Sequence, residues 1–230
     1  MKICGLEKFS LVDYDDYVTC TVFTKGCNFV CPFCHNSSLV LADHFAEAIE
    51  DDVVFDYLTK RKKMVDAVCI TGGEPTLQPD LKDFIKKIKD MGFKVKLDSN
   101  GTKPEIISTL IEEKLIDYVA IDIKNSFEKY TLTTGVKDLD VTPIKESVSL
   151  IKNSPINYEF RTTLIKEHHQ PSDMEKIAEI VSGAKNYVLQ KFKDNGECIS
   201  HGLTEVDKED AEKYLEIVKP HVINAKLRGY

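Results

Sequence analysis

Three cysteines stand close together in the segment 27–36, which reads CNFVCPFCHN. Cys27, Cys31 and Cys34 follow the spacing Cys-x3-Cys-x2-Cys, so one short loop could wrap a metal centre without help from distant sequence. Three thiolates leave one ligand position unfilled. An iron–sulfur cluster held by three cysteines would keep one iron open to an exchangeable ligand, and an open iron is a place for chemistry.

A structural zinc ion is the alternative for the same loop. Zinc requires four ligands, and His35 is an awkward fourth because it directly follows Cys34. Cys198 and His201, in the segment CISH, are better candidates to complete such a site. The spacing alone therefore leaves a zinc site open beside the cluster.

Composition limits the class of protein. The 230 residues are 42% hydrophobic and 30% charged, which predicts one soluble domain over residues 1–230. A formal net charge of -7 argues against a nucleic-acid partner. The N-terminus lacks the pattern of a signal peptide, and no apolar run approaches membrane-spanning length. We therefore expect a cytoplasmic protein with no membrane partner, in which thiols are ligands or buried small residues.

Apolar β-branched runs alternate with longer amphipathic stretches along the chain. The predicted strands are 18–24, 66–72, 93–99, 117–123, 157–165 and 186–192. The predicted helices are 45–62 (beginning at Phe45), 79–91, 104–114, 142–153, 171–181 and 207–219. Alternation of this kind predicts an α/β fold of parallel strands joined by right-handed helical crossovers.

Unusual polar residues follow the ends of these strands. The cysteine loop follows the first strand, and the next three end at TGGEP (71–75), DSNG (98–101) and DIK (122–124). The last two carry Arg161, Thr162 and Gln190. In parallel α/β barrels, catalytic groups gather at this edge of the sheet. Gly and Asn also end strands for structural reasons, but six such coincidences in succession indicate a site.

The cysteine spacing together with Gly72-Gly73-Glu74 resembles the radical S-adenosylmethionine (SAM) superfamily. Within it, the segments CPFCHN, ITGGEPTLQ, LDSNG and IDIK look like the activating enzymes of glycyl radical enzymes. The segment GLEKFSLVDY (5–14) is similar to anaerobic ribonucleoside-triphosphate reductase activating proteins. Those proteins usually continue with Pro-Gly, where this chain has Asp15-Asp16.

The resemblance implies a partial (β/α)6 TIM-like barrel that carries one [4Fe-4S] cluster on Cys27, Cys31 and Cys34. SAM would bind the fourth iron. It also implies a radical SAM oxidoreductase that removes a hydrogen atom from a glycine of a partner glycyl radical enzyme. A flavodoxin or ferredoxin-type protein would donate the electron. Because a hydrogen atom is removed, the enzyme needs to position the reactants and exclude water, and it needs no acid–base catalysis. No catalytic acid–base residue is therefore expected.

The same resemblance assigns residues to the methionine end of SAM. Glu74 and the backbone of the two preceding glycines suit the ammonium, because glycines allow close approach and a carboxylate gives charge-assisted hydrogen bonds. Lys124 suits the carboxylate. Asp98 and Asp122 are both expected near it, and their repulsion suggests that one binds the ammonium or that a monovalent cation sits between them.

At the adenosine end, Phe33 is expected against the adenine, with the backbone of Cys34 and His35 bonding its edge. The other expected cofactor-binding residues are the polar strand-end residues Ser99, Thr162 and Gln190. Phe33 could instead be core packing, and Thr162 and Gln190 could merely satisfy strand ends. The pair His168-His169 is expected in a surface loop. Several activators have Pro-Tyr-His after the sixth strand, where this chain reads QKFK.

Two other functions compete with that of an activator. One is a small-molecule radical SAM enzyme similar to the carboxydeazaguanine synthases, which have similar length and lack a second cluster. The other is a non-catalytic zinc-binding protein.

Overall fold

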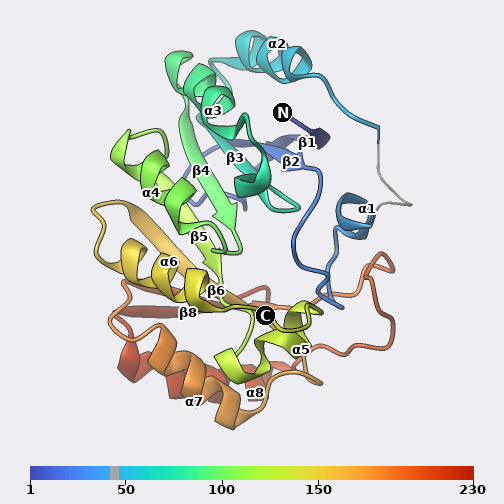
Figure 1. Cartoon of the computed structure of the whole chain (residues 1–230), viewed down its shortest axis with the longest axis vertical. Coiled ribbons are helices and arrows are strands. Elements are labelled where there is room, and N and C mark those ends of the chain that lie inside the picture. The colour runs from blue at the N-terminus through green and yellow to red at the C-terminus, as the bar shows by residue number, and fades with distance from the viewer. Residues whose placement is uncertain (42–46) are drawn as a thin grey trace. The chain divides into compact units, whose positions relative to one another are not determined.

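The computed structural model of the chain describes residues 1–41 and 47–230 (Figure 1). Contacts between Cα atoms divide these residues into two compact units. Unit 1 consists of Met1–Asn28, Ser38–Ser99 and Glu105–Val119. Unit 2 consists of Phe29–Ser37, Asn100–Pro104 and Ala120–Tyr230.

The strands neighbour one another in the sheet in the order in which they occur along the chain. They are β1 (Ile3–Ser10), β2 (Thr19–Thr24), β3 (Ala67–Gly72), β4 (Lys94–Ser99), β5 (Tyr118–Asp122), β6 (Asn157–Leu164), β7 (Asn186–Lys191) and β8 (Asn224–Arg228). The strand β1 is antiparallel to β2, whereas β2, β3 and β4 pair in parallel, as do β6, β7 and β8. The predicted α/β fold with parallel strands is confirmed.

Helices connect the strands. The α-helices are α1 (Ser37–Val40), α2 (Asp51–Arg61), α3 (Leu81–Asp90), α4 (Pro104–Glu112), α5 (Tyr130–Thr134), α6 (Thr142–Lys152), α7 (Pro171–Ile180) and α8 (Lys208–Val218). Short 3-10 helices are η2 (Pro75–Leu77), η3 (Phe127–Lys129) and η4 (Lys219–His221). No helix among the described residues is both long and apolar enough to cross a membrane.

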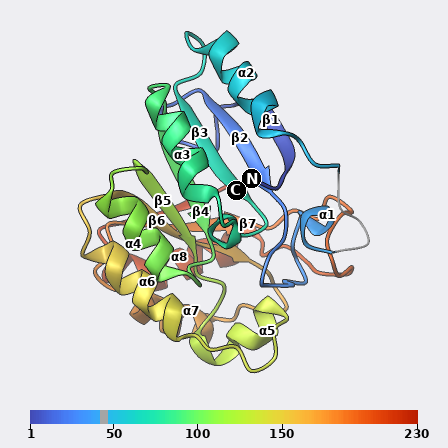
Figure 2. The ribbon, with the colours of Figure 1, turned by 45° about the horizontal axis from the view of Figure 1, so that its top comes forward.

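In unit 1, buried apolar strands form the core. The parallel register of β2 and β3 pairs Thr19 with Ala67 and Thr24 with Gly72, so the two strands end together. Helix α3 packs against β4 through an apolar stripe and lies beside α2 (Figure 2). Phe84 of α3 meets Phe55 of α2 with ring centroids 5.1 Å apart.

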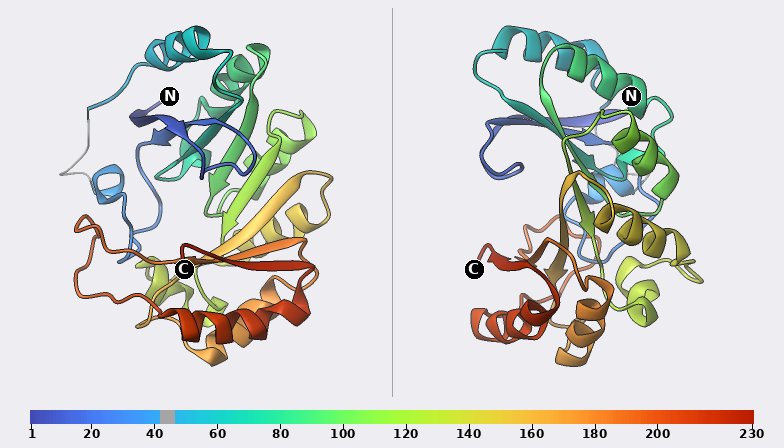
Figure 3. Two further views of the ribbon diagram at one scale, coloured as in Figure 1. Left: turned by 180° about the vertical axis from the view of Figure 1, so that it is seen from behind. Right: turned by 90° about the vertical axis from the view of Figure 1, so that its left-hand side faces the viewer.

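In unit 2, β6, β7 and β8 carry the core, with Tyr158, Phe160 and Tyr187 among its largest fully buried side chains. Helices α7 and α8 run side by side (Figure 3). Helix α7 begins with a capping box, in which Gln170 and Asp173 each bind the other's backbone N–H.

The structure differs from the prediction in several elements. Strands β1 and β8 add to the six predicted strands, and neither α1 nor α5 was predicted. The helix predicted at 45–62 begins at Asp51, because Ile49 instead forms a β-bridge with Ile3. Its predicted start at Phe45 lies outside the described residues. The other predicted helix ends agree within two residues.

Candidate functional site

The cysteine loop leaves β2 and passes from unit 1, which contains Cys27, into unit 2. In unit 2 the backbone N–H of Cys34 donates to the carbonyl of Cys31 at 2.9 Å, so these two cysteines share one tight turn. The loop is anchored by Val30, whose N–H donates to the Thr134 carbonyl at 2.9 Å. A Cβ at Gly135 would lie 2.4 Å from the Val30 carbonyl oxygen, so only glycine fits beneath the loop.

The donor set of this loop fits an iron–sulfur cluster. Burial raises the pKa of the Cys31 thiol to about 11, against the opposing effect of Lys124, and burial also raises that of Cys34. Among the described residues, no three His, Cys, Asp or Glu side chains converge on a single metal ion. A cluster does not require such convergence, because each cysteine thiolate binds a different iron.

The residues named for a zinc site are also in unit 2. The thiol of Cys198 is buried and donates to the Phe33 carbonyl at 3.8 Å. His201 is exposed to solvent. Cys198 therefore supports the backbone beside Cys34, whereas His201 has no burial that would favour a structural role.

The glycines after β3 bring two backbone segments of unit 1 into close contact. A Cβ on Gly73 would lie 2.0 Å from the Gly26 carbonyl oxygen, and one on Gly72 would lie 2.4 Å from the Thr24 nitrogen. Gly73 N–H donates to the Thr24 carbonyl at 2.9 Å, and Glu74 N–H donates to the Gly26 carbonyl at 2.8 Å. These glycines thus fix the backbone that immediately precedes Cys27.

Glu74 is buried at the start of η2 and collects hydrogen bonds on one oxygen. Its Oε1 accepts from the Ser99 hydroxyl at 2.8 Å, from the Thr76 N–H at 3.1 Å and from the Thr76 hydroxyl. Ser99, expected to contact the cofactor, therefore lies against Glu74. Thr76 was missed, although its position two residues after Glu74 in GGEPT is that of a local side-chain cap.

Asp98 lies on β4 beside Lys96, which the strand-end pattern does not include. Its Oδ1 is 3.0 Å from the ammonium of Lys96, and both side chains are buried. Residues two apart on a strand point to the same face, so this pair could have been found from the sequence. Lys96 also donates to the Asp13 carbonyl and lies 5.9 Å from the centroid of the Tyr118 ring.

Asp122, Lys124 and Arg161 form an ion cluster in unit 2. Asp122 Oδ2 is 2.9 Å from the Lys124 ammonium, and Oδ1 is 2.5 Å from Arg161 Nε. Burial would raise the pKa of Asp122, but the two cations hold it well below its usual range. Burial likewise opposes charge on Lys124, and the neighbouring carboxylate keeps its pKa raised. One carboxylate therefore accepts hydrogen bonds from two cations.

Phe33 is buried in unit 2 beside this cluster. The Lys124 ammonium is 5.8 Å from the centroid of the Phe33 ring, within cation–π range, and the His168 ring meets Phe33 edge-on at 6.0 Å. The His35 ring packs against Phe192 with centroids 5.4 Å apart, and burial lowers the pKa of His35. Phe33 and Lys124, expected at opposite ends of SAM, are thus in contact.

Thr162 and Gln190 are both engaged by protein groups in unit 2. The buried Thr162 hydroxyl donates to the Ile123 carbonyl at 2.6 Å and accepts from the Tyr187 hydroxyl at 2.6 Å. Gln190 Oε1 accepts from Arg228 at 3.0 Å, and the same guanidinium binds both oxygens of the buried Glu159 at 2.8 and 2.9 Å. This bidentate pair was missed because β8 was not predicted.

His168 and His169 are buried, so their expected place in a surface loop is wrong. They follow β6 in a turn in which both backbone N–H groups donate to the Ile165 carbonyl, at 3.1 and 2.9 Å. The His169 ring is enclosed completely, and its Nε2 lies 3.0 Å from the Lys124 carbonyl. The turn therefore contacts both Phe33 and Lys124.

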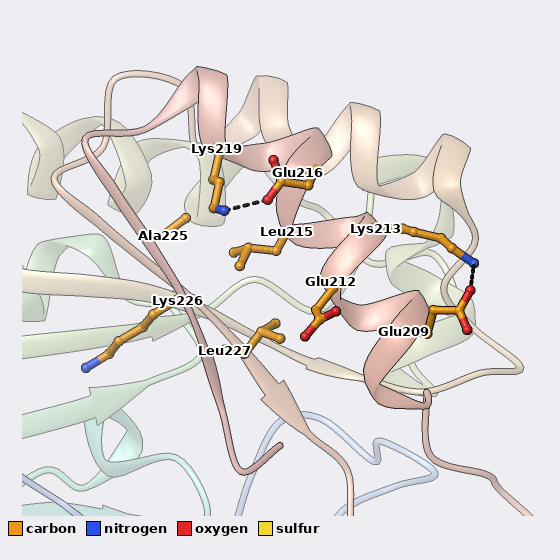
Figure 4. Close-up of a pocket in the computed structure, with 9 residues that line it drawn as sticks. All are labelled: Glu209, Glu212, Lys213, Leu215, Glu216, Lys219, Ala225, Lys226 and Leu227. Carbon is orange, nitrogen blue, oxygen red and sulfur yellow. Dashed lines mark hydrogen bonds and ion pairs between the residues drawn. The ribbon is translucent and has the colours of Figure 1, made fainter.

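A groove of about 750 Å³ lies between α8 and β8, and none of the predicted site residues lines it (Figure 4). It is lined by Glu209, Glu212, Lys213, Leu215, Glu216, Lys219, Ala225, Lys226 and Leu227. Lys219 pairs with Glu216, and Lys213 pairs with Glu209 at 3.1 Å, so the charges on its rim largely offset one another.

The chain is similar in sequence to a known family and to individual proteins within it. The model of the radical SAM superfamily matches residues 21–181. A Methanocaldococcus jannaschii protein named as a glycyl-radical enzyme activating enzyme is 36% identical over 198 residues, which span 83% of this chain and 79% of that protein. Pyruvate formate-lyase-activating enzyme of Listeria monocytogenes is 31% identical over 178 residues, spanning 72% and 70%.

A solved structure gives the same fold at lower identity. It is a domain of pyruvate-formate lyase-activating enzyme from Bacteroides vulgatus, with a TM-score of 0.59 and 18% sequence identity. The match covers 71% of this chain and 99% of that domain.

Proposed function

This chain belongs to the radical SAM superfamily and, within it, to the glycyl-radical enzyme activating enzymes, and on that premise we propose that its protein substrate is an anaerobic ribonucleoside-triphosphate reductase. The family implies a [4Fe-4S] cluster and SAM as cofactors. Residues 1–230 act as one radical SAM domain. A flavodoxin or ferredoxin-type protein supplies the electron.

The observation that carries the choice of partner is the turn after β1. Activators of this reductase usually place Pro-Gly after the segment similar to GLEKFSLVDY, and Pro-Gly suits the two central positions of a type II turn. Here the Tyr17 N–H donates to the Tyr14 carbonyl at 3.2 Å, and Asp16 has φ = +71° at the position of that glycine. Aspartate tolerates this left-handed region, so Asp15-Asp16 makes the turn that Pro-Gly would make.

When bound, the cluster and SAM together supply a 5'-deoxyadenosyl radical, which takes a hydrogen atom from the Cα of the partner's glycine. Cys27, Cys31 and Cys34 hold the cluster. Glu74, with Oε1 fixed by Ser99 and Thr76, accepts hydrogen bonds from the ammonium of SAM.

Other residues hold the rest of the cofactor. Lys124 binds the carboxylate of SAM through its ammonium, which the ion pair with Asp122 at 2.9 Å holds in place. Phe33 lies against the adenine. These tasks are binding, orientation and exclusion of water, which suit a reaction that moves a hydrogen atom and not a proton.

The test of this function is electron paramagnetic resonance on the activator and the purified reductase under anaerobic conditions, with SAM and a reductant. We expect a glycine-centred signal that requires both proteins, with about one 5'-deoxyadenosine formed per radical, as this cofactor chemistry requires. The matched pair Cys31→Ser and Cys198→Ser controls the ligand assignment. The first should lose iron and signal, whereas the second should keep both.

Two results would contradict the proposal. If Cys198→Ser lost iron while Cys31→Ser kept it, the ligand set would be wrong. If SAM were cleaved without a radical on the reductase, but with turnover of a small molecule, the chain would belong with enzymes similar to the carboxydeazaguanine synthases.

A further inference from the structure

His169 is a fully buried histidine to which the proposed function gives no task. It lies in the turn after β6, and both of its ring nitrogens are within hydrogen-bond distance of backbone groups. The Ile165 N–H donates to Nδ1 at 3.0 Å, and Nε2 is 3.0 Å from the carbonyl oxygen of Lys124. One ring therefore links the turn after β6 to the residue that follows β5 by two positions.

These contacts determine where the ring proton lies. A backbone N–H can only donate, so Nδ1 must accept, and the proton on Nε2 is donated to the Lys124 carbonyl. In the other neutral tautomer the proton is on Nδ1, which could donate only to the Ile165 carbonyl at 3.2 Å. The lone pair of Nε2 would then face a lone pair of the Lys124 carbonyl oxygen, which is unfavourable. Burial lowers the pKa of His169 to about 4, so the ring is neutral near pH 7.

Three groups of Lys124 are bound by other residues: its carbonyl, its backbone N–H and its ammonium. Its carbonyl accepts from His169, its N–H donates to the Tyr130 hydroxyl at 3.1 Å, and its ammonium is 2.9 Å from Asp122 Oδ2. A lysine side chain has four rotatable bonds, so the position of its ammonium depends on a fixed backbone. The contact with His169 ties the carbonyl of Lys124 itself to the turn after β6.

We propose that His169 is a positioning residue for SAM binding: by donating Nε2–H to the Lys124 carbonyl, it holds Lys124 where the ammonium can bind the carboxylate of SAM. This inference rests on the proposed role of Lys124. His169 itself does not touch the cofactor.

Two substitutions of His169 separate its two hydrogen bonds. In His169→Asn, Oδ1 can take the place of Nδ1 and accept from Ile165, but the side chain is too short to reach Lys124. In His169→Gln, the longer amide can place an N–H near the position of Nε2 and keep the bond to Lys124. The first variant therefore keeps the local turn and loses the link, whereas the second keeps the link.

The measurement is calorimetric titration of cluster-loaded protein with SAM under anaerobic conditions. We expect His169→Asn to weaken affinity about tenfold, the size expected for one buried hydrogen bond, and His169→Gln to stay close to wild type. Tyr214→Phe is the control, because the Tyr214 hydroxyl donates to the His169 carbonyl at 3.0 Å and its loss loosens the same turn without touching the ring. It should leave the affinity unchanged.

The outcomes distinguish this inference from the function on which it rests. Equal losses in all three variants would mean that only the stability of the turn matters, which overturns the inference. If Lys124→Met bound SAM as tightly as wild type, the proposed role of Lys124 would fail. Nitrogen-15 spectra of histidine-labelled protein test the geometry separately, and a proton on Nδ1 of His169 would overturn the inference whatever the affinities.

Discussion

Glu74 and Asp122 are both carboxylates at the ends of parallel strands, yet the protein surrounds them differently. In unit 1, Glu74 Oε1 accepts from one backbone N–H and two hydroxyl groups. In unit 2, Asp122 is bound by an ammonium and a guanidinium. These neutral donors orient the Glu74 carboxylate by hydrogen bonds. The two cations instead keep the Asp122 carboxylate ionised, with its pKa well below the usual range.

The comparison shows two ways in which this protein fixes a carboxylate at a strand end. Neutral hydrogen-bond donors hold Glu74, whereas ion pairs hold Asp122. Four measurements can break or sharpen this contrast.

The largest effect is expected from Asp122→Asn, which leaves Lys124 and Arg161 as partly buried cations without a carboxylate between them. We expect a loss of about 4 kcal/mol in the free energy of unfolding, because removing one partner of a buried ion pair strands the charge of the other. Urea denaturation measures the shift of the midpoint at constant slope. Lys176→Ala, at the exposed Lys176–Glu128 pair of 3.4 Å, should cost almost nothing. A small loss in both would mean that charge does not hold unit 2 together here.

Next in size is a dependence on pH that belongs to unit 2. The pKa of His169 falls from its ordinary 6.5 to about 4 on folding, so the folded state binds fewer protons than the unfolded chain between these values. The stability is therefore full above pH 6.5 and is lost as pH falls toward 4, by roughly 3 kcal/mol at 1.36 kcal/mol per pKa unit. Asp122, whose pKa is lowered, adds its loss only below its ordinary value of 3.8.

The measurement is urea denaturation of wild type and His169→Gln at intervals from pH 7 to pH 4. The difference between the two proteins isolates the histidine, because the other titrating groups are shared. Parallel curves would show that folding does not change the pKa of His169, contrary to the effect expected from its burial.

A smaller effect is expected in unit 1, where backbone packing takes the place of charge. Gly73→Ala would set a Cβ 2.0 Å from the Gly26 carbonyl oxygen, so the backbone before Cys27 must move. We expect a loss of about 2 kcal/mol and less iron bound after reconstitution. Gly5→Ala is the matched control, since its Cβ would lie 3.1 Å from the Phe23 side chain, which can give way. Equal losses in the two variants would contradict the close approach at Gly73.

The smallest effect is expected from Ser99→Ala, which removes one of the hydrogen bonds to Glu74 Oε1. We expect a loss of about 1 kcal/mol in SAM binding, measured by titration, because Thr76 still orients the carboxylate. Thr109→Ala, at an exposed hydroxyl that donates to the Glu105 carbonyl at 2.9 Å, is the control. A loss as large as that of Glu74→Ala would show that Ser99 itself binds SAM.

The sequence predicted the parallel strands well because buried parallel strands are continuous apolar runs. The first and last residues of β2 to β7 each agree with the predicted bounds to within one residue. Strand β1 was missed because ICGLEKFS lacks such a run, and β8 because NAKLR is short and only partly buried. Edge strands carry a weaker apolar pattern in the sequence than central strands. Their pairing therefore becomes evident only from the hydrogen bonds of the folded chain.

Partners of the site residues were harder to predict than the residues themselves. Lys96 and Thr76 lie two residues from Asp98 and Glu74, where strand alternation or a local cap could have identified them. The bonds from Arg228 to Glu159 and from His169 to Lys124 join residues 69 and 45 positions apart, and no local pattern encodes them. The functional residue types at a strand end can be read from the local sequence. The residues that hold them in place come from other strands and are distant in the sequence.

The chain-order arrangement of the strands has a consequence for how the protein is made. In β1 to β4, and again in β6 to β8, each strand pairs with the one synthesised just before it. Each of these strands therefore finds its partner already present when it leaves the ribosome. The edge that receives the next strand is covered in turn, which limits how long any unpaired edge is open to aggregation.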